Sequence, residues 1–267
     1  IATVKVLLIF TVLLTLFSLL TWVERRFLAF AQFRLGPNRT GPFGILQPVA
    51  DGLKLFFKED MAPQNANLLA FFAAPVLAVT AAFTAVAVVP YGPPLTLPAW
   101  GFLPQWLQGR PFTLQIADLD VGILYIFAIT SLGVYGIVLA GWSANNKYSL
   151  FGGLRSSAQM FSYELSLGLS FVGLIMLAGS FRIQDIAARQ AGGFWNWHVF
   201  PQFLAFLTYF ISATAEVSRT PFDLPEAESE LVAGYHTEYS SMKFALLQMA
   251  EYINMITVAA LTANLFL

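Results

Sequence analysis

The sequence predicts an all-α membrane protein, a polytopic transmembrane helix bundle that forms a single domain over residues 1–267. Of its residues, 57% are hydrophobic and only 11% are charged, whereas a soluble domain carries roughly a quarter charged residues. Several apolar stretches are long enough for a helix to cross the hydrocarbon core of a bilayer, which is about 30 Å thick. These observations exclude a water-soluble fold.

Six stretches satisfy the requirement of about 20 apolar residues, because each helical residue rises roughly 1.5 Å along the axis. Pro75 in the second stretch and Pro201 near the start of the fifth predict kinks rather than breaks, since neighbouring helices can satisfy the freed carbonyl groups. The predicted spans are residues 4–23, 67–89, 121–142, 157–177, 199–215 and 242–267.

The basic residues gather on one side of the predicted bundle. Most of the 14 Lys and Arg residues lie in or beside segments 24–66, 143–156 and 217–241, and cytoplasmic loops carry the excess of basic residues in membrane proteins. We therefore expect these three segments to be cytoplasmic loops and the N-terminus to lie outside. The remaining basic residues are Lys5, Arg110, Arg182 and Arg189.

Two connections are expected to lie at the membrane surface. Residues 45–58 have apolar and polar positions at helical spacing, which predicts an amphipathic helix in the interface. Residues 91–120 are rich in Pro and Trp and weakly charged, and Trp anchors chains at the interface. This second segment is expected to be an interfacial cover on the outer side.

Several functional classes are excluded by composition and motif. The chain has no cysteine, so it cannot form disulfides, thiolate zinc sites or cysteine-ligated iron–sulfur clusters. The net charge of −1 shows no bias toward nucleic acid. No phosphate-binding loop or HExxH zinc motif is present. His198 and His236 are far apart in sequence, and His198 is expected to be an interfacial residue.

Three carboxylates fall in or at the ends of predicted spans: Glu164, Glu216 and Glu251. An ionisable residue inside a membrane costs about 2.5–3.5 kcal/mol on insertion scales, so such residues indicate function. Glu164 lies two turns into the span 157–177, and Gly168 one turn later leaves room for a partner helix or water. Glu251 has polar residues three positions before and after it, which points it inward. Proton transfer is the functional interpretation, and hydrogen bonding between helices is the structural alternative.

The loop PFDLPEAESELVAGYHTEYS, residues 221–240, is densely acidic. If residues 226–231 form a helical turn, Glu226 and Glu230 share a face, where like charges favour retention of one proton. The loop is then a proton reservoir, and a solvated acidic loop is the alternative. Its titratable residues are Asp223, Glu226, Glu228, Glu230, His236 and Glu238.

The segment FRLGPNRTGPFGILQPVADGLK, residues 33–54, places Arg34 and Asp51 among glycines that let the backbone approach another surface closely. It is expected to bind a partner subunit or a polar head group.

Together, GPNRTGPFG, YELSLGL around Glu164, and EVSRTPFDLPEAESELVAGYHTEYSS resemble one family over nearly the whole chain. The sequence resembles the H-type membrane subunit of the proton-translocating NADH–quinone oxidoreductase, respiratory complex I. Members of that family continue past Leu267 with further helices and begin with a short upstream segment. We therefore expect this chain to be a truncated form of an eight-span protein.

The resemblance implies a translocase subunit of a bacterial cytoplasmic (inner) membrane, with its N-terminus on the periplasmic side. It would dock the peripheral redox arm, line the quinone chamber and couple quinone reduction to proton translocation. It would bind no cofactor itself, because FMN and iron–sulfur clusters belong to partner subunits. The implied quinone-cavity residues are Arg34, Asp51, Arg219 and Asp223. The implied proton path comprises Glu164, Glu216, Glu226, Glu228 and Glu230.

One position departs from the family pattern. Some members carry a further glutamate in the third span, where this chain has Thr130 and Ser131 in FAITSLGVYG, so that relay position is not available here. Two alternatives remain open at this point. One is the equivalent subunit of a membrane-bound hydrogenase, which lacks a quinone site, and the other is a secondary transporter that uses Glu164 and Glu216 as proton sites.

Overall fold

The structure of the protein is a computed structural model that describes residues 2–92, 95–96, 111–225 and 228–267. The α-helices are α1 (Ala2–Ala31), α2 (Gln47–Phe57), α3 (Leu68–Val86), α4 (Gly122–Ser143), α5 (Lys147–Ala178), α6 (Ile183–Arg189), α7 (Phe203–Glu216), α8 (Glu228–Leu231) and α9 (Ser241–Phe266). The other described elements are the 3-10 helices η1 (Pro42–Gly44), η2 (Phe194–Asn196) and η3 (Gly234–His236), and the antiparallel strands β1 (Leu95–Thr96) and β2 (Pro111–Phe112).

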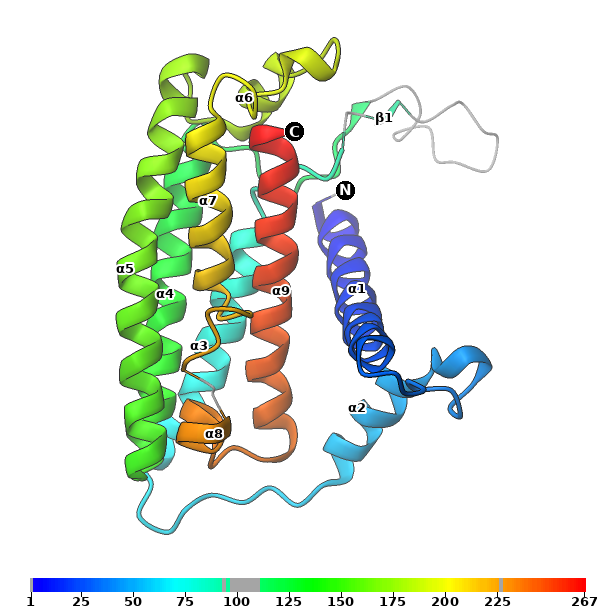
Figure 1. Ribbon diagram of the computed structural model, residues 1–267, viewed down its shortest axis with the longest axis vertical. Helices are drawn as coiled ribbons and strands as arrows, with labels where there is room; N and C mark the ends of the chain where they lie inside the picture. Colours follow the sequence, from blue (N-terminus) through cyan, green and yellow to red (C-terminus); the bar gives the residue numbers. More distant parts are fainter. Residues whose placement is uncertain (1, 93–94, 97–110, 226–227) are drawn as a thin grey trace.

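The long helices form a bundle with their axes roughly aligned (Figure 1). α3 packs along α4, α4 along α5 and α5 along α7, while α9 packs against α3. α1 stands beside α9, to one side of the other helices (Figure 1), and its contacts are mainly with α2 and α9. The prediction of an all-α polytopic bundle is confirmed.

Among the described residues, five helices are long and apolar enough to cross a membrane: α1 from Thr3, α3, α4, α5 and α9. The predicted fifth span corresponds to α7, which has 14 residues and therefore a length of about 21 Å, less than the hydrocarbon core. α7 is short because Pro201 precedes it rather than lying inside it, and because the chain turns at Ser218, where φ is +52°. Pro75, by contrast, lies within α3, and the helix continues through it.

Two helices extend beyond the spans that hydropathy predicts. α1 continues to Ala31, so Glu24, Arg25 and Arg26 are helical rather than part of a loop. α5 begins at Lys147, ten residues before the predicted span. The side chain of Asn146 caps it by accepting a hydrogen bond of 2.9 Å from the backbone N–H of Tyr148. The expected loops 24–66 and 143–156 are therefore shorter than predicted, because hydropathy detects the membrane core and not the helix ends.

Small residues let the central helices approach closely. A Cβ atom added to Gly136 in α4 would lie 2.8 Å from the backbone nitrogen of Ala78 in α3. A Cβ added to Gly152 in α5 would lie 2.5 Å from the carbonyl carbon of Gly234 in η3. Close approach of this kind is how helices associate within membranes, where packing replaces the hydrophobic effect. η3 approaches α5 closely in the same way.

Two clusters of buried side chains form the interior. One joins α4, α5, α7 and α9 through residues that include Ile126, Phe171, Tyr209 and Phe266. The other joins α1, α3 and α9 and includes Ile9, Leu13, Phe71 and Ile253. Of these two clusters in the described part of the chain, the second alone contains residues of α1, so α1 packs on the bundle along a narrow stripe.

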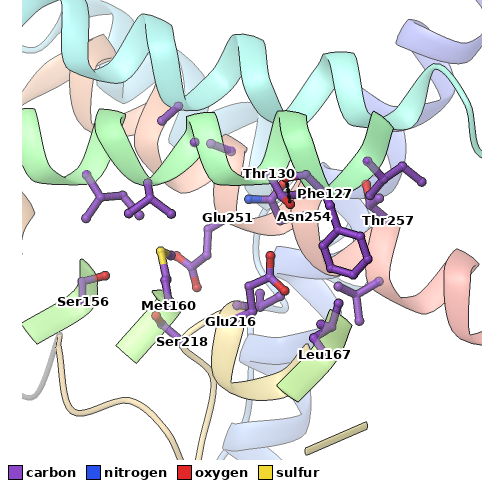
Figure 2. Close-up of a pocket in the computed structure, with 18 of the residues that line it drawn as sticks. Phe127, Thr130, Ser156, Met160, Leu167, Glu216, Ser218, Glu251, Asn254 and Thr257 are labelled. Atoms are coloured by element: carbon purple, nitrogen blue, oxygen red, sulfur yellow. Dashed lines mark hydrogen bonds between the residues drawn. The ribbon is translucent and has the colours of Figure 1, made fainter. Parts of the chain in front are cut away.

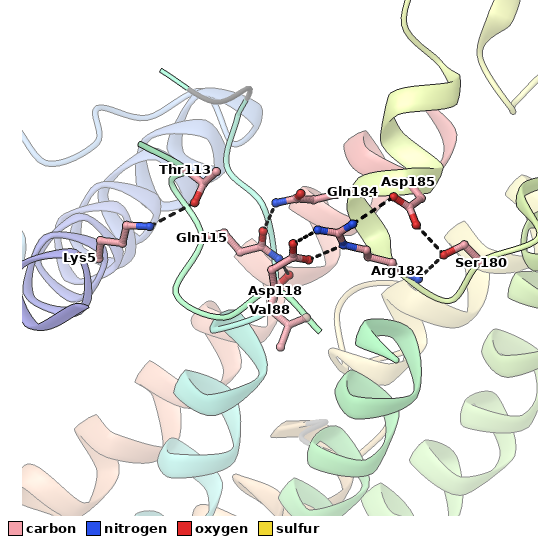
Figure 3. A network of polar contacts seen from close by, with 9 residues as sticks. All are labelled: Lys5, Val88, Thr113, Gln115, Asp118, Ser180, Arg182, Gln184 and Asp185. Atoms are coloured by element: carbon pink, nitrogen blue, oxygen red, sulfur yellow. Dashed lines mark hydrogen bonds and ion pairs between the residues drawn. The ribbon is translucent and has the colours of Figure 1, made fainter. Parts of the chain in front are cut away.

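A polar network ties the connections together at the end of the bundle that holds both chain termini (Figures 1 and 3). The segment between α3 and α4 contacts α1 through a hydrogen bond of 3.1 Å from Lys5 to Thr113. The same segment contacts α6 through a pair between Gln184 and Gln115. Arg182 binds Asp118 through two nitrogens, and this guanidinium lowers the pKa of the Asp118 carboxyl below its ordinary value of 3.8.

α2 is the amphipathic helix predicted over residues 45–58. It begins at Gln47 and ends at Phe57, and its apolar residues Val49, Leu53 and Phe56 are exposed in this chain. The interfacial cover predicted at residues 91–120 lies largely outside the described residues. His198, predicted to be an interfacial residue, is buried within the protein, and its Nδ1 lies 2.9 Å from the carbonyl oxygen of Leu265.

Candidate functional site

A cavity lies inside the bundle, between α3, α4, α5, α7 and α9 (Figure 2). The volume open to the centres of water molecules is about 80 Å³, whereas roughly 10–15 Å³ is enough for one water. Most of the wall is apolar, as at Phe127 and Leu167. Two carboxylates, Glu216 and Glu251, also line it. Acidic groups in such a setting can exchange protons with bound water.

Glu216 reaches the cavity because it is the last residue of α7. The chain turns immediately after it, where the N–H of Ser218 donates to the carbonyl of Ala215 at 3.1 Å. In Figure 2 the carboxylate of Glu216 points into the cavity from below, and Glu251 enters from α9. The sequence therefore pointed to two carboxylates that face one cavity, although it could not show that they share it.

Glu251 is paired with Arg219, whose Nε lies 2.9 Å from a Glu251 oxygen. A second carboxylate, Glu24 of α1, lies 2.8 Å from another nitrogen of the same guanidinium. The ring of Tyr252 lies 4.6 Å from the guanidinium carbon, and its hydroxyl donates to Glu24 at 2.5 Å. Burial opposes the charge of Arg219, but Glu251, Tyr252 and Glu24 outweigh it and raise the pKa of Arg219 above its usual range. The cation therefore stays charged.

Glu24 and Tyr252 were not among the residues predicted to form the site. The available signal for Glu24 was a carboxylate directly before two arginines at the end of an apolar stretch. Its partner Arg219 is 195 positions away in sequence, so only the packing that brings the end of α1 to the segment after α7 identifies the pair. Tyr252 had no signal, because a tyrosine in an apolar helix resembles any other core residue.

Glu164 lies near the middle of α5 rather than two turns from its start, because α5 begins at Lys147. It accepts a hydrogen bond from the hydroxyl of Ser131 in α4. A Cβ atom added to Gly168 would meet Phe127 of α4 at 3.9 Å, so the space beside Gly168 adjoins a partner helix. The hydroxyl of Ser131, one of the two residues singled out in FAITSLGVYG, therefore binds the carboxylate of the neighbouring helix.

The acidic segment, residues 217–241, is partly described. Glu230 pairs with Arg155 of α5 at 2.5 Å, and both side chains are about half exposed, at 52% and 48%. Asp223 is also exposed. Glu226 lies outside the described residues, and Glu228 is described only as the first backbone position of α8. The proton reservoir therefore stays a prediction.

His236 lies in η3 and is enclosed by rings, with the ring centroid of Tyr235 at 5.0 Å and that of Phe244 at 5.4 Å. Burial lowers the pKa of His236 from 6.5 to about 4, because the charged imidazolium is disfavoured away from water. The imidazole is neutral near pH 7.

Arg34 and Asp51, the other predicted quinone-cavity residues, belong to the α1–α2 region. Arg34 follows α1 and donates from Nε to the Gln32 side chain at 2.7 Å. Asp51 of α2 pairs with Arg25 and accepts from Gln47 at 3.1 Å. In the part of the chain that the structure describes, neither residue forms a hydrogen bond or ion pair with Arg219 or Glu216. Of the residues predicted to line the quinone cavity, Arg219 therefore lies at the bundle, whereas Arg34 and Asp51 lie in the α1–α2 region.

Among residues 2–92, 95–96, 111–225 and 228–267, no group of three or more His, Cys, Asp or Glu side chains could hold a metal ion. The polar groups at the cavity are carboxylates, hydroxyls and the amide of Asn254. This set is suited to binding water and protons.

A model of the NADH dehydrogenase family matches residues 4–267. The chain is similar to H-type subunits of bacterial NADH-quinone oxidoreductases. One from Koribacter versatilis is 53% identical, covering 100% of this chain and 76% of its own length. One from Geobacter sulfurreducens is 53% identical, over 98% of this chain and 75% of its own. The counterpart from Thermomicrobium roseum is 51% identical, over 96% and 74%.

Proposed function

The chain belongs to the NADH dehydrogenase family, as its motifs predicted, and on that premise we propose that it lines a quinone-binding chamber and couples quinone reduction to proton movement. It is a membrane subunit of a proton-translocating NADH–quinone oxidoreductase, respiratory complex I. The finer assignments, namely the chamber, the proton path and the docking of the redox arm, rest on the contacts of individual residues.

The observation that carries the proposal is that Glu216 and Glu251 line one cavity within the bundle. Carboxylates inside a membrane protein mark proton relays and ion paths more often than structural sites. Glu164 adds a third acidic group on the adjoining helix, held by Ser131. These three residues form the proposed membrane part of the proton path, and Glu226, Glu228 and Glu230 form its proposed entry from the acidic segment.

The chemistry of the substrate sets the demand for protons. A quinone that receives two electrons must also take up two protons to leave as a neutral quinol. The electrons come from iron–sulfur clusters in partner subunits of the peripheral arm, which also holds FMN. The protons are supplied through the carboxylates of this chain, so each quinone turnover changes the charge of Glu216 and its neighbours.

The quinone head group is proposed to contact Arg34, Asp51, Arg219 and Asp223. Arg219 is suited to this because three neighbours from α1 and α9 already hold its guanidinium in place. Arg34 and Asp51 would contribute from the α2 side. Two parts of the chain are proposed as contact surfaces, namely α2 with its exposed apolar residues and the acidic segment. Their proposed partners are the lipid surface, other membrane-arm subunits and the peripheral arm.

The three connections that hold most basic residues are proposed to face the cytoplasm of a bacterial cell, with the N-terminus on the periplasmic side. The basic excess on that side supports this orientation. The relatives named above are all quinone oxidoreductase subunits, so neither the hydrogenase nor the transporter alternative gains support.

The test is to purify the assembled complex through this subunit and to measure inhibitor-sensitive electron transfer from NADH to quinone together with proton uptake. Glu216→Gln should leave assembly intact and slow quinone reduction about a hundredfold or more, because proton transfer by a positioned group contributes roughly 10²–10⁴-fold. Electron transfer from NADH to a soluble acceptor should be unchanged. Full quinone reduction and full proton uptake by the assembled variant would remove Glu216 from the mechanism.

A further inference from the structure

Five of the hydroxyl groups at the cavity fall into two kinds. Those of Tyr209, Thr130 and Thr257 donate to backbone carbonyls, at 3.0 Å to Val258, 3.2 Å to Phe127 and 2.9 Å to Ile253. Their donors are therefore already used within the protein. The hydroxyls of Ser156 and Ser218 also line the cavity and behave differently.

Ser156 and Ser218 are 0% and 6% exposed, and within the described part of the chain neither Oγ has a hydrogen-bond partner. More than about 90% of buried polar groups in proteins are hydrogen-bonded, to the protein or to ordered water. A buried hydroxyl that faces a cavity of this size therefore indicates a water site. Such a site needs two to four polar partners, and the cavity offers these serines together with the two carboxylates.

The two serines come from different elements but lie on the same side of the cavity. Ser156 belongs to α5, and Ser218 follows the end of α7, two residues after Glu216. Figure 2 shows both near Met160, with Glu216 and Glu251 between them and the apolar wall at Phe127 and Leu167. The serines therefore lie where water can reach both carboxylates.

We propose that Ser156 and Ser218 are positioning residues that hold ordered water in this cavity, and that this water transfers protons between Glu216 and Glu251. The inference rests on the proposed function, because it assumes that these carboxylates carry protons. In each transfer the water accepts a proton from the Glu216 carboxyl and gives another of its protons to the Glu251 carboxylate. Glu216 is left as the carboxylate, Glu251 becomes the neutral acid, and the water is unchanged.

The consequence for Glu251 is electrostatic. A neutral Glu251 no longer attracts Arg219 as an ion, while Glu24 still does. When the serine-bound water delivers a proton to Glu251, Arg219 loses its ion pair with Glu251 and keeps its ion pair with Glu24 of α1. The protonation state of Glu251 in the cavity is thereby linked to the contact of α1 with the rest of the bundle, and α1 packs along a narrow stripe.

The test compares two hydroxyl deletions with two matched controls in the assembled complex. Ser156→Ala and Ser218→Gly remove the proposed anchors, and glycine suits the φ of +52° at position 218. Ser157→Ala and Ser170→Ala are the controls. Both control residues are buried in α5, outside the cavity wall. Their hydroxyls donate within the helix, at 3.0 Å to Leu154 and 2.6 Å to Leu167.

Each anchor deletion should slow proton uptake during quinone reduction about fivefold to tenfold, as expected for the loss of one hydrogen bond to the transferring water. The solvent deuterium isotope effect should rise. Infrared difference spectra recorded in ordinary and ¹⁸O-labelled water should lose a water O–H band. Because both serines hold the same water, the double variant should be slower than either single variant by less than the product of the two effects.

Ser156→Ala and Ser218→Gly complexes that match the Ser157→Ala and Ser170→Ala controls in rate, isotope effect and spectrum would overturn the inference. Strictly multiplicative effects in the double variant would overturn the shared water. Glu216→Gln separates this from the proposed function: if it blocks proton uptake while the serine variants do not, only the water inference fails. If Glu216→Gln is fully active, the proton path itself fails.

Discussion

The Nε atom of Arg219 lies 2.9 Å from a carboxylate oxygen of Glu251, and this ion pair ties the segment after α7 to α9. The same guanidinium also reaches Glu24 in α1 at 2.8 Å. One cation therefore joins three parts of the chain that are far apart in sequence. α1 depends on this contact more than the other long helices do, because it packs along a narrow stripe only.

Removing the charge of Glu251 should destabilise the protein more than removing that of Glu24. The Glu251 side chain is 10% exposed and that of Glu24 is 35% exposed, and ion pairs gain strength as they leave water. We expect Glu251→Gln to cost about 2 kcal/mol and Glu24→Gln about 0.5–1 kcal/mol. Thermal unfolding of the purified complex measures both.

The double variant Glu24→Gln/Glu251→Gln should cost more than the sum of the single variants, because Arg219 then remains as a partly buried cation without either carboxylate. Glu59→Gln is a suitable control, since Glu59 is exposed. Additive costs in the double variant would show that Arg219 does not link the two carboxylates energetically.

Arg34→Ala should weaken quinone or inhibitor binding more than it weakens assembly. Arg34 is exposed and contacts Gln32 of its own segment, so its loss leaves the bundle intact. We expect KM for quinone to rise about tenfold, equivalent to about 1.4 kcal/mol of binding, with an unchanged amount of complex in the membrane. Arg39→Ala, in the same segment, controls for the loss of one positive charge. Loss of the complex from membranes would make Arg34 a docking residue instead.

Acidification should open the segment around His236. The folded pKa is lowered by burial to about 4, while the unfolded imidazole titrates near 6.5. The stability from burying a neutral His236 is therefore present above pH 6.5 and is lost as the pH falls from 6.5 toward 4. Hydrogen exchange of residues 234–237, corrected for intrinsic rates, should show local opening that rises up to about tenfold per pH unit over this range.

His236→Phe is the matched variant, because an apolar ring can replace the imidazole between Tyr235 and Phe244. It should remove the pH dependence of exchange in residues 234–237. A dependence that persists in His236→Phe would assign it to another group in the acidic segment.

The pair of Asp118 and Arg182 should hold the connection between α3 and α4 onto α6 at all pH values above about 4. The pKa of Asp118 is lowered by Arg182, so this stabilisation is present above 3.8 and is lost only as the pH falls through the lower folded value. Asp118→Asn should speed hydrogen exchange of residues 113–118 at neutral pH. Asp120→Asn, at an exposed position two residues later, removes only a weaker electrostatic attraction to Arg182 and should have a much smaller effect; equal effects of the two would contradict the assigned pairing.

The membrane-spanning helices were predictable because their signal is local. A stretch of about 20 apolar residues is a property of consecutive positions, and α1, α3, α4, α5 and α9 follow from it. The ends of the helices were not predictable in the same way. α5 starts ten residues early because Asn146 caps it, and α7 is short because of Pro201 and the turn at Ser218.

The sequence predicted the acidic residues of the candidate site within the spans, but not how they are arranged. Glu164, Glu216 and Glu251 stood out because carboxylates are costly in apolar helices. Nothing in the local sequence could show that Ser131 binds Glu164, or that Glu24 pairs with Arg219 over 195 positions. Hydrogen bonds and ion pairs across a bundle depend on which helix faces touch.

The sequence by itself determined that this protein is a helical membrane protein of a recognisable family with acidic residues inside its bundle, since hydropathy, charge and motifs are read along the chain. Only the tertiary structure decided that Glu216 and Glu251 share a cavity, that two serines face it without a protein partner among the described residues, and that Arg219 holds α1. The physical reason is that hydrogen bonds and ion pairs act over a few ångströms, and only packing brings distant helices that close.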